Sequence, residues 1–404
     1  MGALSGNRTL RSTRYATSLM RRNRLVMIPV VRNMSLALLA FSTTVPALYA
    51  YEPVPAQATE RVYVMTNDAK KNEVLAFARG SDGSFYSIGR YDTGGRGSGG
   101  TTDPLASQGA LTFSQDHAFL FAVNAGSGTV SSFIVSTNGL VLADKKPTEG
   151  AEPVSVTQHG QFVYVLNQGS YGGVTVFSLD RSGHLTPVPN STVLLSGNDV
   201  GGASVAVSPD GQFLAVVERL SNNVDIFHIL PDGTLSAITT TPDKNPGGFS
   251  AIFTHGGQLL VSETGPANVT DGSTISSFSI NSNATIIPVS SAVPTDGAGN
   301  CWLVLTPDGN AVYTSNSASS SISGFKVAGN GVLTSIGGVI VGTNPSGSIN
   351  LELGISSDGK FLYSLNSGTG TIGVFSIQPD GTLQEEAAIP GLPKNAGIEG
   401  LAAF

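Results

Sequence analysis

The chain has 404 residues, including 50 glycines and 21 prolines, and only 12% of its residues are charged. This composition favours many short strands joined by tight turns and excludes a protein built from long helices. A single cysteine, Cys301, excludes an internal disulfide. The formal net charge of −7 argues against nucleic-acid binding, which depends on a basic patch.

Residues 1–58 differ in kind from the rest of the chain, because they hold seven arginines and a single acid, Glu52. An uncharged stretch at 33–51 follows the basic region, and small residues offer cleavage sites between Ala47 and Ala58. This order predicts a signal or targeting segment at 1–58, and therefore a protein exported to the periplasm or the extracellular space.

Two alternatives to a cleaved leader concern the same residues. One is a twin-arginine signal at 21–22, and the other is an uncleaved membrane anchor. Pro46 and three hydroxyl residues make a poor spanning helix, so we expect no stable membrane span in the mature form. Removal of the leader leaves 14 basic residues against 27 acidic ones, a net charge of −13 that further disfavours nucleic acid.

An apolar strand that ends in asparagine or glutamate recurs through the rest of the chain. It is found at 63–67, 121–124, 164–167, 215–218, 260–263, 313–316 and 363–366. Successive last residues lie 57, 43, 51, 45, 53 and 50 positions apart, a period typical of propellers and solenoids. Seven units therefore fill a single domain at 59–404.

Each unit repeats the same order of strands and turns. An inner strand such as 204–208 precedes the recurring strand, and a turn such as Pro-Asp-Gly at 209–211 often joins the two. Proline presets φ, aspartate caps the turn and glycine accepts a positive φ. An alternating strand such as 371–377 and then an outer strand follow. Four antiparallel strands per unit form the blade of a propeller.

The two ends of the repeat region complement each other. The first unit begins at its second strand, 62–66, whereas the chain finishes with a surplus strand at 397–404. Pairing of these two segments closes the ring and removes an exposed edge. The sequence thus predicts an all-β, seven-bladed β-propeller of four-stranded antiparallel blades, closed by the C-terminal strand pairing into the first blade.

Several short runs are distinctive: YVMTN at 63–67, SPDGQFL at 208–214, PDGTL at 231–235 and 379–383, and GLAAF at 400–404. These runs resemble the lactonase-like propeller family, also called YVTN-repeat propellers, over about residues 61–404. The family includes 6-phosphogluconolactonase and carboxy-muconate cyclase types, so the resemblance implies the seven-bladed fold and a lactonase-like hydrolase. The segments 103–109, 218–219 and 301–302 are similar to an exported subgroup.

Candidate catalytic residues follow from a departure within the repeat. Five recurring strands end in asparagine, but two adjacent ones end in Glu218 and Glu263. Repulsion between paired carboxylates raises one pKa toward the range of a general base. The donor fork of Arg219 suits a substrate carboxylate or an oxyanion. We predict catalysis by Glu218 and Arg219; the alternative is that Glu218 caps its turn and Arg219 makes a surface ion pair.

The loops that lead into the inner strands of a propeller rim one mouth of the central channel, where function concentrates. Candidate substrate-binding residues on this rim are Gln108, Glu263, Cys301, Trp302 and Glu399. Three of the histidines, including His117, fall in turns between inner and second strands, so none is expected to reach the channel mouth. We expect neither a metal nor a cofactor, since zinc and calcium spacings are missing.

Two functions fit these observations. The first is an exported lactonase-like enzyme that hydrolyses a small sugar-derived or carboxylated lactone at the channel mouth. The second is a non-catalytic secreted or periplasmic propeller that binds a protein or glycan partner. A rim where glutamate and arginine converge would favour the enzyme, and a plugged apolar channel would favour the binding protein. We expect a monomer in either case.

Overall fold

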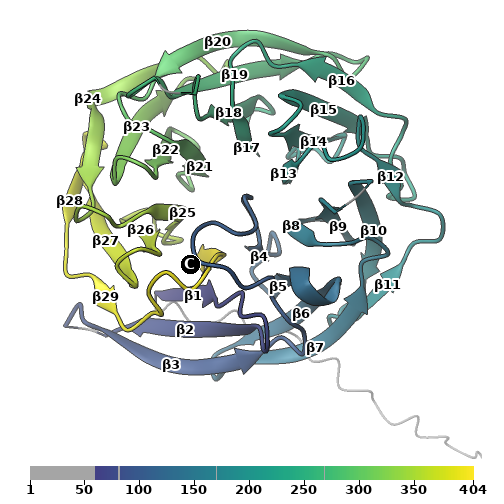
Figure 1. Cartoon of the computed structure of the whole chain (residues 1–404), viewed down its shortest axis with the longest axis horizontal. Coiled ribbons are helices and arrows are strands. Elements are labelled where there is room, and N and C mark those ends of the chain that lie inside the picture. The colour runs from purple at the N-terminus through teal and green to yellow at the C-terminus, as the bar shows by residue number, and fades with distance from the viewer. Residues whose placement is uncertain (1–59, 81, 170, 268) are drawn as a thin grey trace, which may run out of the picture. The chain divides into compact units, whose positions relative to one another are not determined.

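The computed structural model describes residues 60–404 except 81, 170 and 268, so the leader predicted at 1–58 lies outside the described residues. Seven antiparallel sheets surround a central axis, as Figure 1 shows. This arrangement confirms the all-β, seven-bladed propeller. The described residues contain no helix with the length and apolar character that a membrane span requires.

The blades are numbered in chain order, and their strands are given from the axis outward. Blade 1 contains β30 (Leu401–Ala403), β1 (Arg61–Met65), β2 (Glu73–Arg79) and β3 (Phe85–Asp92). Blade 2 contains β4 (Leu111–Phe113), β5 (Phe119–Asn124), β6 (Thr129–Ser136) and β7 (Gly139–Pro147), with the short helix η1 (Ala125–Ser127) after β5. Blade 3 contains β8 (Pro153–His159), β9 (Phe162–Asn167), β10 (Gly173–Leu179) and β11 (Leu185–Pro187), and β12 (Val193–Leu194) also pairs with β10.

Blade 4 contains β13 (Gly202–Val207), β14 (Phe213–Glu218), β15 (Asn223–His228) and β16 (Thr239–Pro242). Blade 5 contains β17 (Gly248–Phe253), β18 (Leu259–Glu263), β19 (Thr274–Ile280) and β20 (Ile286–Pro294). Blade 6 contains β21 (Asn300–Leu305), β22 (Ala311–Asn316), β23 (Ser321–Val327) and β24 (Leu333–Thr343). Blade 7 contains β25 (Asn350–Ile355), β26 (Phe361–Asn366), β27 (Thr371–Ile377) and β28 (Leu383–Glu385), and β29 (Ile389–Pro390) also pairs with β27.

The C-terminal strand closes the ring as expected. β30 pairs antiparallel with β1, placing Tyr63 opposite Ala402. The strand is shorter than the expected 397–404, because Gly397 and Gly400 adopt positive φ values of 69° and 91° and turn the chain. A side chain at Gly400 would place its Cβ 2.9 Å from the Cβ of Leu111, so glycine is required where β30 approaches blade 2.

The turns between inner and second strands work by the predicted mechanism. The Oδ1 of Asp210 accepts a hydrogen bond from the Ser208 hydroxyl at 2.6 Å and another from the Gln212 backbone at 3.1 Å. Gly211 has a φ of 69°. In blade 2 the equivalent position is His117, which adopts a φ of 57° despite its side chain.

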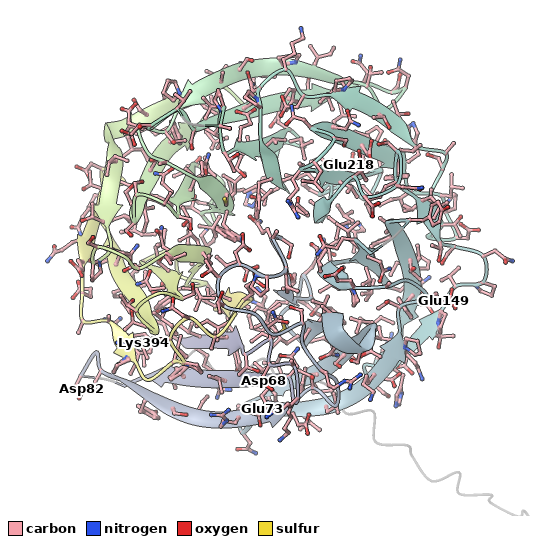
Figure 2. The ribbon with its side chains drawn as sticks, in the orientation of Figure 1. Asp68, Glu73, Asp82, Glu149, Glu218 and Lys394 are labelled. Carbon is pink, nitrogen blue, oxygen red and sulfur yellow. The ribbon has the colours of Figure 1, made fainter. Side chains whose placement is uncertain are left out.

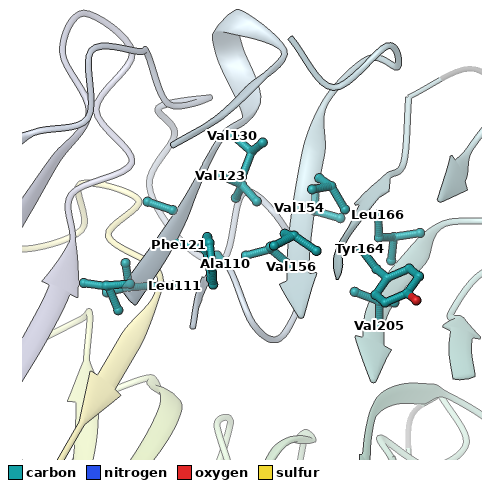
Figure 3. Packing of buried hydrophobic residues seen from close by; sticks show 14 of the residues in the cluster. Ala110, Leu111, Phe121, Val123, Val130, Val154, Val156, Tyr164, Leu166 and Val205 are labelled. Carbon is teal, nitrogen blue, oxygen red and sulfur yellow. The ribbon is translucent and has the colours of Figure 1, made fainter. Parts of the chain in front are cut away.

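The hydrophobic core lies between the faces of adjacent blades. Figure 3 shows the region where blades 2, 3 and 4 meet, with Phe121 and Val123, Val156 and Tyr164, and Val205. All five side chains are buried. Because each blade is covered by its neighbours on both sides, removal of one blade contact exposes apolar surface on two sheets.

We expect Phe404→Ala to lower the free energy of unfolding by about 3–5 kcal/mol, because Phe404 is buried against Tyr63, Phe113 and His117 at the seam of the ring. Urea denaturation monitored by circular dichroism measures the change. Val141→Ala, at a residue that is 56% exposed, is the control and should change stability by less than about 0.5 kcal/mol. Equal effects of the two substitutions would contradict this account of closure.

Candidate functional site

The chain segment between β3 and β4 runs into the centre of the ring (Figure 1, dark blue). We call residues 103–109 of this segment the plug. The Ser107 hydroxyl donates to the carbonyl of Val154 in blade 3 at 2.9 Å, and the backbone of Gln108 donates to the carbonyl of Ala203 in blade 4 at 2.9 Å. These contacts are at the starts of the inner strands. The plug therefore fills that end of the channel, which we call the upper mouth.

The plug also bonds to the opposite side of the ring. The indole N–H of Trp302 donates to the Ser107 carbonyl at 2.8 Å, and the backbone of Leu303 donates to Oε1 of Gln108 at 2.8 Å. The backbone N–H of Gly109 donates to Oε1 of Glu352 at 2.8 Å. Blades 3, 4, 6 and 7 thus all hold the plug by hydrogen bonds.

A single position in the inner strand determines how blades 6 and 7 reach the plug. In blades 3 to 5 the third residue of the strand is serine, and the Ser204 hydroxyl accepts from the backbone of Ala251 in the next inner strand at 2.9 Å. In blades 6 and 7 the same position holds Trp302 and Glu352. The larger side chains extend to the plug. The two inner strands in which this serine is replaced therefore contribute the side chains, Trp302 and Glu352, that hold the plug.

Two carboxyl groups meet at the upper mouth. Oε2 of Glu399 accepts a hydrogen bond from the backbone of Leu105 at 2.9 Å, and Glu399 is also hydrogen-bonded to Asp103. Burial raises the pKa of both carboxyls, and the bond to Asp103 raises the pKa of Glu399 further. The charge of Arg219 lowers the pKa of Asp103 in part. The pair ties the plug to blade 1, because Glu399 precedes β30 and Asp103 belongs to the plug.

The structure brings most of the predicted channel residues together. Gln108, Trp302 and Glu399 bond to the plug or belong to it, and Arg219 lies near enough to Asp103 to affect its pKa. Cys301 is buried beside them, and burial raises the pKa of its thiol well above the usual range. A thiol in this state is a packing group rather than a nucleophile.

Glu218 lies over the fourth blade and away from the centre of the ring (Figure 2). Its carboxylate accepts hydrogen bonds from the Ser196 backbone at 2.8 Å and from the Ser221 hydroxyl at 2.5 Å, and it pairs with Asp225. These are the contacts of a turn cap, which was the alternative interpretation. A catalytic role for Glu218 stays a prediction.

Glu263 does not pair with Glu218. Its Oε1 accepts a hydrogen bond from Asn245 at 3.1 Å, and its acidic neighbour is Asp243. Burial and the charge of Asp243 raise the pKa of Glu263 to about 7. Each of the two glutamates thus faces an acid other than its expected partner.

We expect Asp225→Asn to flatten the pH dependence of stability. Burial, together with the hydrogen bond to Glu218, raises the pKa of Asp225 to about 8 from an ordinary value of 3.8. The folded state therefore holds a proton that the unfolded state has lost between these values, and stability falls as pH rises from about 4 to about 8. The shift accounts for at most about 6 kcal/mol.

Differential scanning calorimetry at pH 5 and pH 8 tests this. The melting temperature of Asp225→Asn should exceed that of the wild type at pH 8 and differ less at pH 5. Asp232→Asn, in an exposed turn whose carboxylate has a lowered pKa, is the control. If the stability of the wild type changed between pH 5 and pH 8 in the same way as that of the variant, a raised pKa of Asp225 beside Glu218 would be ruled out.

A cavity of about 460 Å³ lies beneath the plug and extends to the turns at the other end of the inner strands, which we call the lower mouth. We call it the axial cavity. Gln108, Gly109 and Glu352 form its inner end. Its walls are apolar side chains of five inner strands, mainly Leu111, Phe113, Ile252, Leu303, Leu305, Leu353, Ile355, Leu401 and Ala403. Apolar cavities of this size with a few polar groups are typical ligand sites.

Two polar side chains, Glu352 and Gln108, lie at the inner end of the axial cavity. Oε1 of Glu352 bonds to Gly109, but Oε2 has no partner among the described residues. Burial raises the pKa of Glu352 to about 7, although several nearby backbone N–H groups lower it. Oε1 of Gln108 accepts from Leu303, and its Nε2 has no partner in the described part of the chain. The side chains of Gln108 and Glu352 thus both line the inner end of the axial cavity.

His117 lies in the turn between β4 and β5, as expected, and this turn contributes to the wall of the axial cavity away from the upper mouth. Its ring stacks on Phe404 at 5.8 Å and meets Phe113 edge-on at 5.2 Å. Burial lowers the pKa of His117, so the imidazole is neutral at pH 7. The signal in the sequence was the replacement of the turn glycine by histidine, since a residue held at positive φ often serves a site.

This arrangement suits hydrolysis of a polar bond in an apolar molecule. A carboxyl group with a pKa near 7 can accept a proton from water, and an amide N–H can stabilise a developing oxyanion. No cluster of three or more histidine, cysteine, aspartate or glutamate side chains suited to a metal ion occurs in the described ranges. Glu352 and His117 are the titratable groups in the lining.

Comparison with known proteins agrees with this fold. Residues 53–200 match the family described as lactonase, 7-bladed beta-propeller. A 6-phosphogluconolactonase from Formosa agariphila is 28% identical over 129 residues, which cover 29% of this chain and 35% of that protein. The chain thus matches about a third of the length of this relative.

Solved structures resemble the chain over most of its length. A putative 6-phosphogluconolactonase from Bacteroides fragilis has a TM-score of 0.64 and 20% identity, covering 87% of this chain and 99% of its own. The periplasmic gluconolactonase of Pseudomonas aeruginosa has a TM-score of 0.63 and 20% identity, covering 85% and 99%. At this identity the likeness concerns the fold.

Fold and site together define a closed seven-bladed propeller whose channel is plugged at one mouth and hollow at the other. Within that class, the family match over residues 53–200 and the closing strand make the chain similar to the lactonase-like seven-bladed β-propellers.

Proposed function

We propose that the chain hydrolyses a small lactone in the axial cavity, with Glu352 as general base and Gln108 as hydrogen-bond donor to the lactone carbonyl. The observation that carries this proposal is that Glu352, whose Oε2 has no partner among the described residues, and Gln108 both line the inner end of an apolar cavity. The family and the names of its relatives support ring-ester hydrolysis as the class of reaction.

The proposed reaction balances with water as the second reactant. Glu352 takes a proton from water while the oxygen of that water forms a bond to the lactone carbonyl carbon. Gln108 donates a hydrogen bond to the oxyanion. The bond from the carbonyl carbon to the ring oxygen then breaks, and Glu352 returns the proton to the ring oxygen, which leaves as a hydroxyl group. The product is a hydroxy acid, whose ionisation releases a proton to solvent.

We expect Glu352→Gln to lower kcat at least about 100-fold, since the amide keeps an acceptor for Gly109 but cannot accept the proton. Wild-type kcat/KM should rise with pH and level off above about 7, where Glu352 is ionised. Proton release from a lactone panel, followed with a pH indicator, measures both. Asp243→Asn, which also removes a carboxyl of raised pKa but lies outside the cavity, is the matched control.

The same assay separates this proposal from the prediction based on Glu218 and Arg219. Full activity in Glu352→Gln, together with lost activity in Glu218→Gln and Arg219→Ala, would move catalysis to the upper face. Loss in Glu352→Gln alone would support the axial cavity. Melting temperatures of all four proteins show whether a loss reflects unfolding.

A non-catalytic propeller remains the second candidate, because the plug closes the upper mouth and large apolar side chains are exposed on loops of the same face. Tyr171, Leu220 and Val269 project from upper loops of blades 3, 4 and 5 and are more than half exposed. Such a surface suits a protein or glycan partner. Absence of turnover across the lactone panel by a folded wild-type protein would favour this function over hydrolysis.

We also propose that the protein is exported, on the support of the basic and then apolar order of residues 1–58. Expression of the full chain with a C-terminal tag, followed by fractionation, should place the product outside the cytoplasm. Its N-terminal sequence should begin between residues 48 and 59. A cytoplasmic product that retains residue 1 would contradict export.

A further inference from the structure

The charge of the axial cavity indicates its substrate class. Within residues 60–404 as described, its lining contains no lysine or arginine, and its two titratable groups are Glu352 and His117. His117 is neutral at pH 7 because burial lowers its pKa, and Glu352 when ionised repels anions. A phosphate or carboxylate in the cavity would lose its hydration without gaining a cationic partner, which is strongly unfavourable.

The polar groups of the cavity are also too few for a sugar. Most of the wall is aliphatic or aromatic, and Leu305, Ile252 and Phe113 keep part of their surface exposed there. The hydroxyls of a sugar lactone would lie against this wall without partners, at a cost for each. An alkyl chain in the same place would cover the exposed apolar surface and displace water from it.

We infer that the axial cavity takes an uncharged lactone that bears an alkyl chain, and that it rejects phosphorylated and polyhydroxylated lactones. The hydrolysis of a lactone in this inference rests on the proposed function. The selectivity among lactones rests on the residues that line the cavity alone. The lactone ring lies at the inner end, against Gln108 and Glu352, and the chain extends toward the lower mouth. Arg219, on which the expectation of an anionic substrate depended, lies outside the lining.

The first experiment compares kcat/KM for γ-butyrolactone, γ-hexalactone and γ-octalactone with that for glucono-δ-lactone and 6-phosphogluconolactone. Two added methylene groups should raise kcat/KM about tenfold while the chain still fits. Both sugar lactones should be poorer substrates than γ-octalactone. A preference for 6-phosphogluconolactone would overturn the inference and leave the proposed hydrolysis intact.

A second experiment measures binding without turnover. The only tryptophan, Trp302, bonds to the plug beside Gln108 at the inner end of the cavity, so its fluorescence can report an occupant. 2-Pentylcyclopentanone carries a ring carbonyl and an alkyl chain but has no ester bond. Saturable binding of this ketone without lactone turnover would refute the proposed function and support the substrate class as a ligand class. Absence of both would overturn both.

A charge substitution tests the cause of the selectivity. Leu305→Lys places a cation on the cavity wall and should lower kcat/KM for γ-octalactone at least about tenfold relative to that for 6-phosphogluconolactone. Leu230→Lys, at an exposed leucine outside the lining, is the matched control and should leave both values unchanged. An unchanged ratio in folded Leu305→Lys protein would overturn the inference.

Discussion

The inner strand of each blade turns one edge toward the axis, and the backbone groups on that edge need hydrogen-bond partners once the ring has closed. The plug supplies them at the upper mouth. Ser107 and Gln108 satisfy carbonyls of Val154 and Ala203, and Gln108 also accepts from the backbone of Leu303. Because the plug ends at Gly109, the lower half of the channel has no such filling, and the axial cavity occupies that space. The hydrogen bonds of the plug thus determine which part of the channel is filled and which part forms the axial cavity.

The buried acids of the channel divide along the same boundary. Glu399 lies beside Asp103 at the upper mouth, and its Oε2 holds the backbone of Leu105, so Glu399 serves the plug. Glu352 gives one oxygen to Gly109, and its other oxygen, like Oε1 of Glu399, has no partner among the described residues. Burial raises the pKa of all three carboxyls. Of these three carboxyls, only Glu352 lines the axial cavity, so position in the channel, and not the pKa alone, distinguishes the candidate base from the groups that hold the plug.

Local sequence signals were sufficient for the blades, because the Asp-Gly turns and the spacing of the recurring strands depend on neighbouring residues. They also pointed to Gln108, Trp302 and Glu399, which depart from the repeat near the inner strands. The partner of Glu218 could not be found in this way. Asp225 of β15 lies opposite Val216 of β14, and Val216 is two residues before Glu218 in the same strand. Because side chains alternate along a strand, the register places Asp225 and Glu218 on one face of the sheet. Glu352 was missed because its role depends on the plug, although its replacement of the repeating serine was visible in the sequence.

Closure of the ring and formation of the cavity depend on the same short strand. Leu401 and Ala403 of β30 pair with β1 and also line the axial cavity, and Phe404 packs against His117 on its wall. Gln108 reaches the inner end through a bond to Leu303, 195 residues away in the chain. The cavity therefore has no independent local element that could form before the blades meet. Its geometry is a product of the closed ring, so a substitution at the seam acts on the wall of the site as well as on stability.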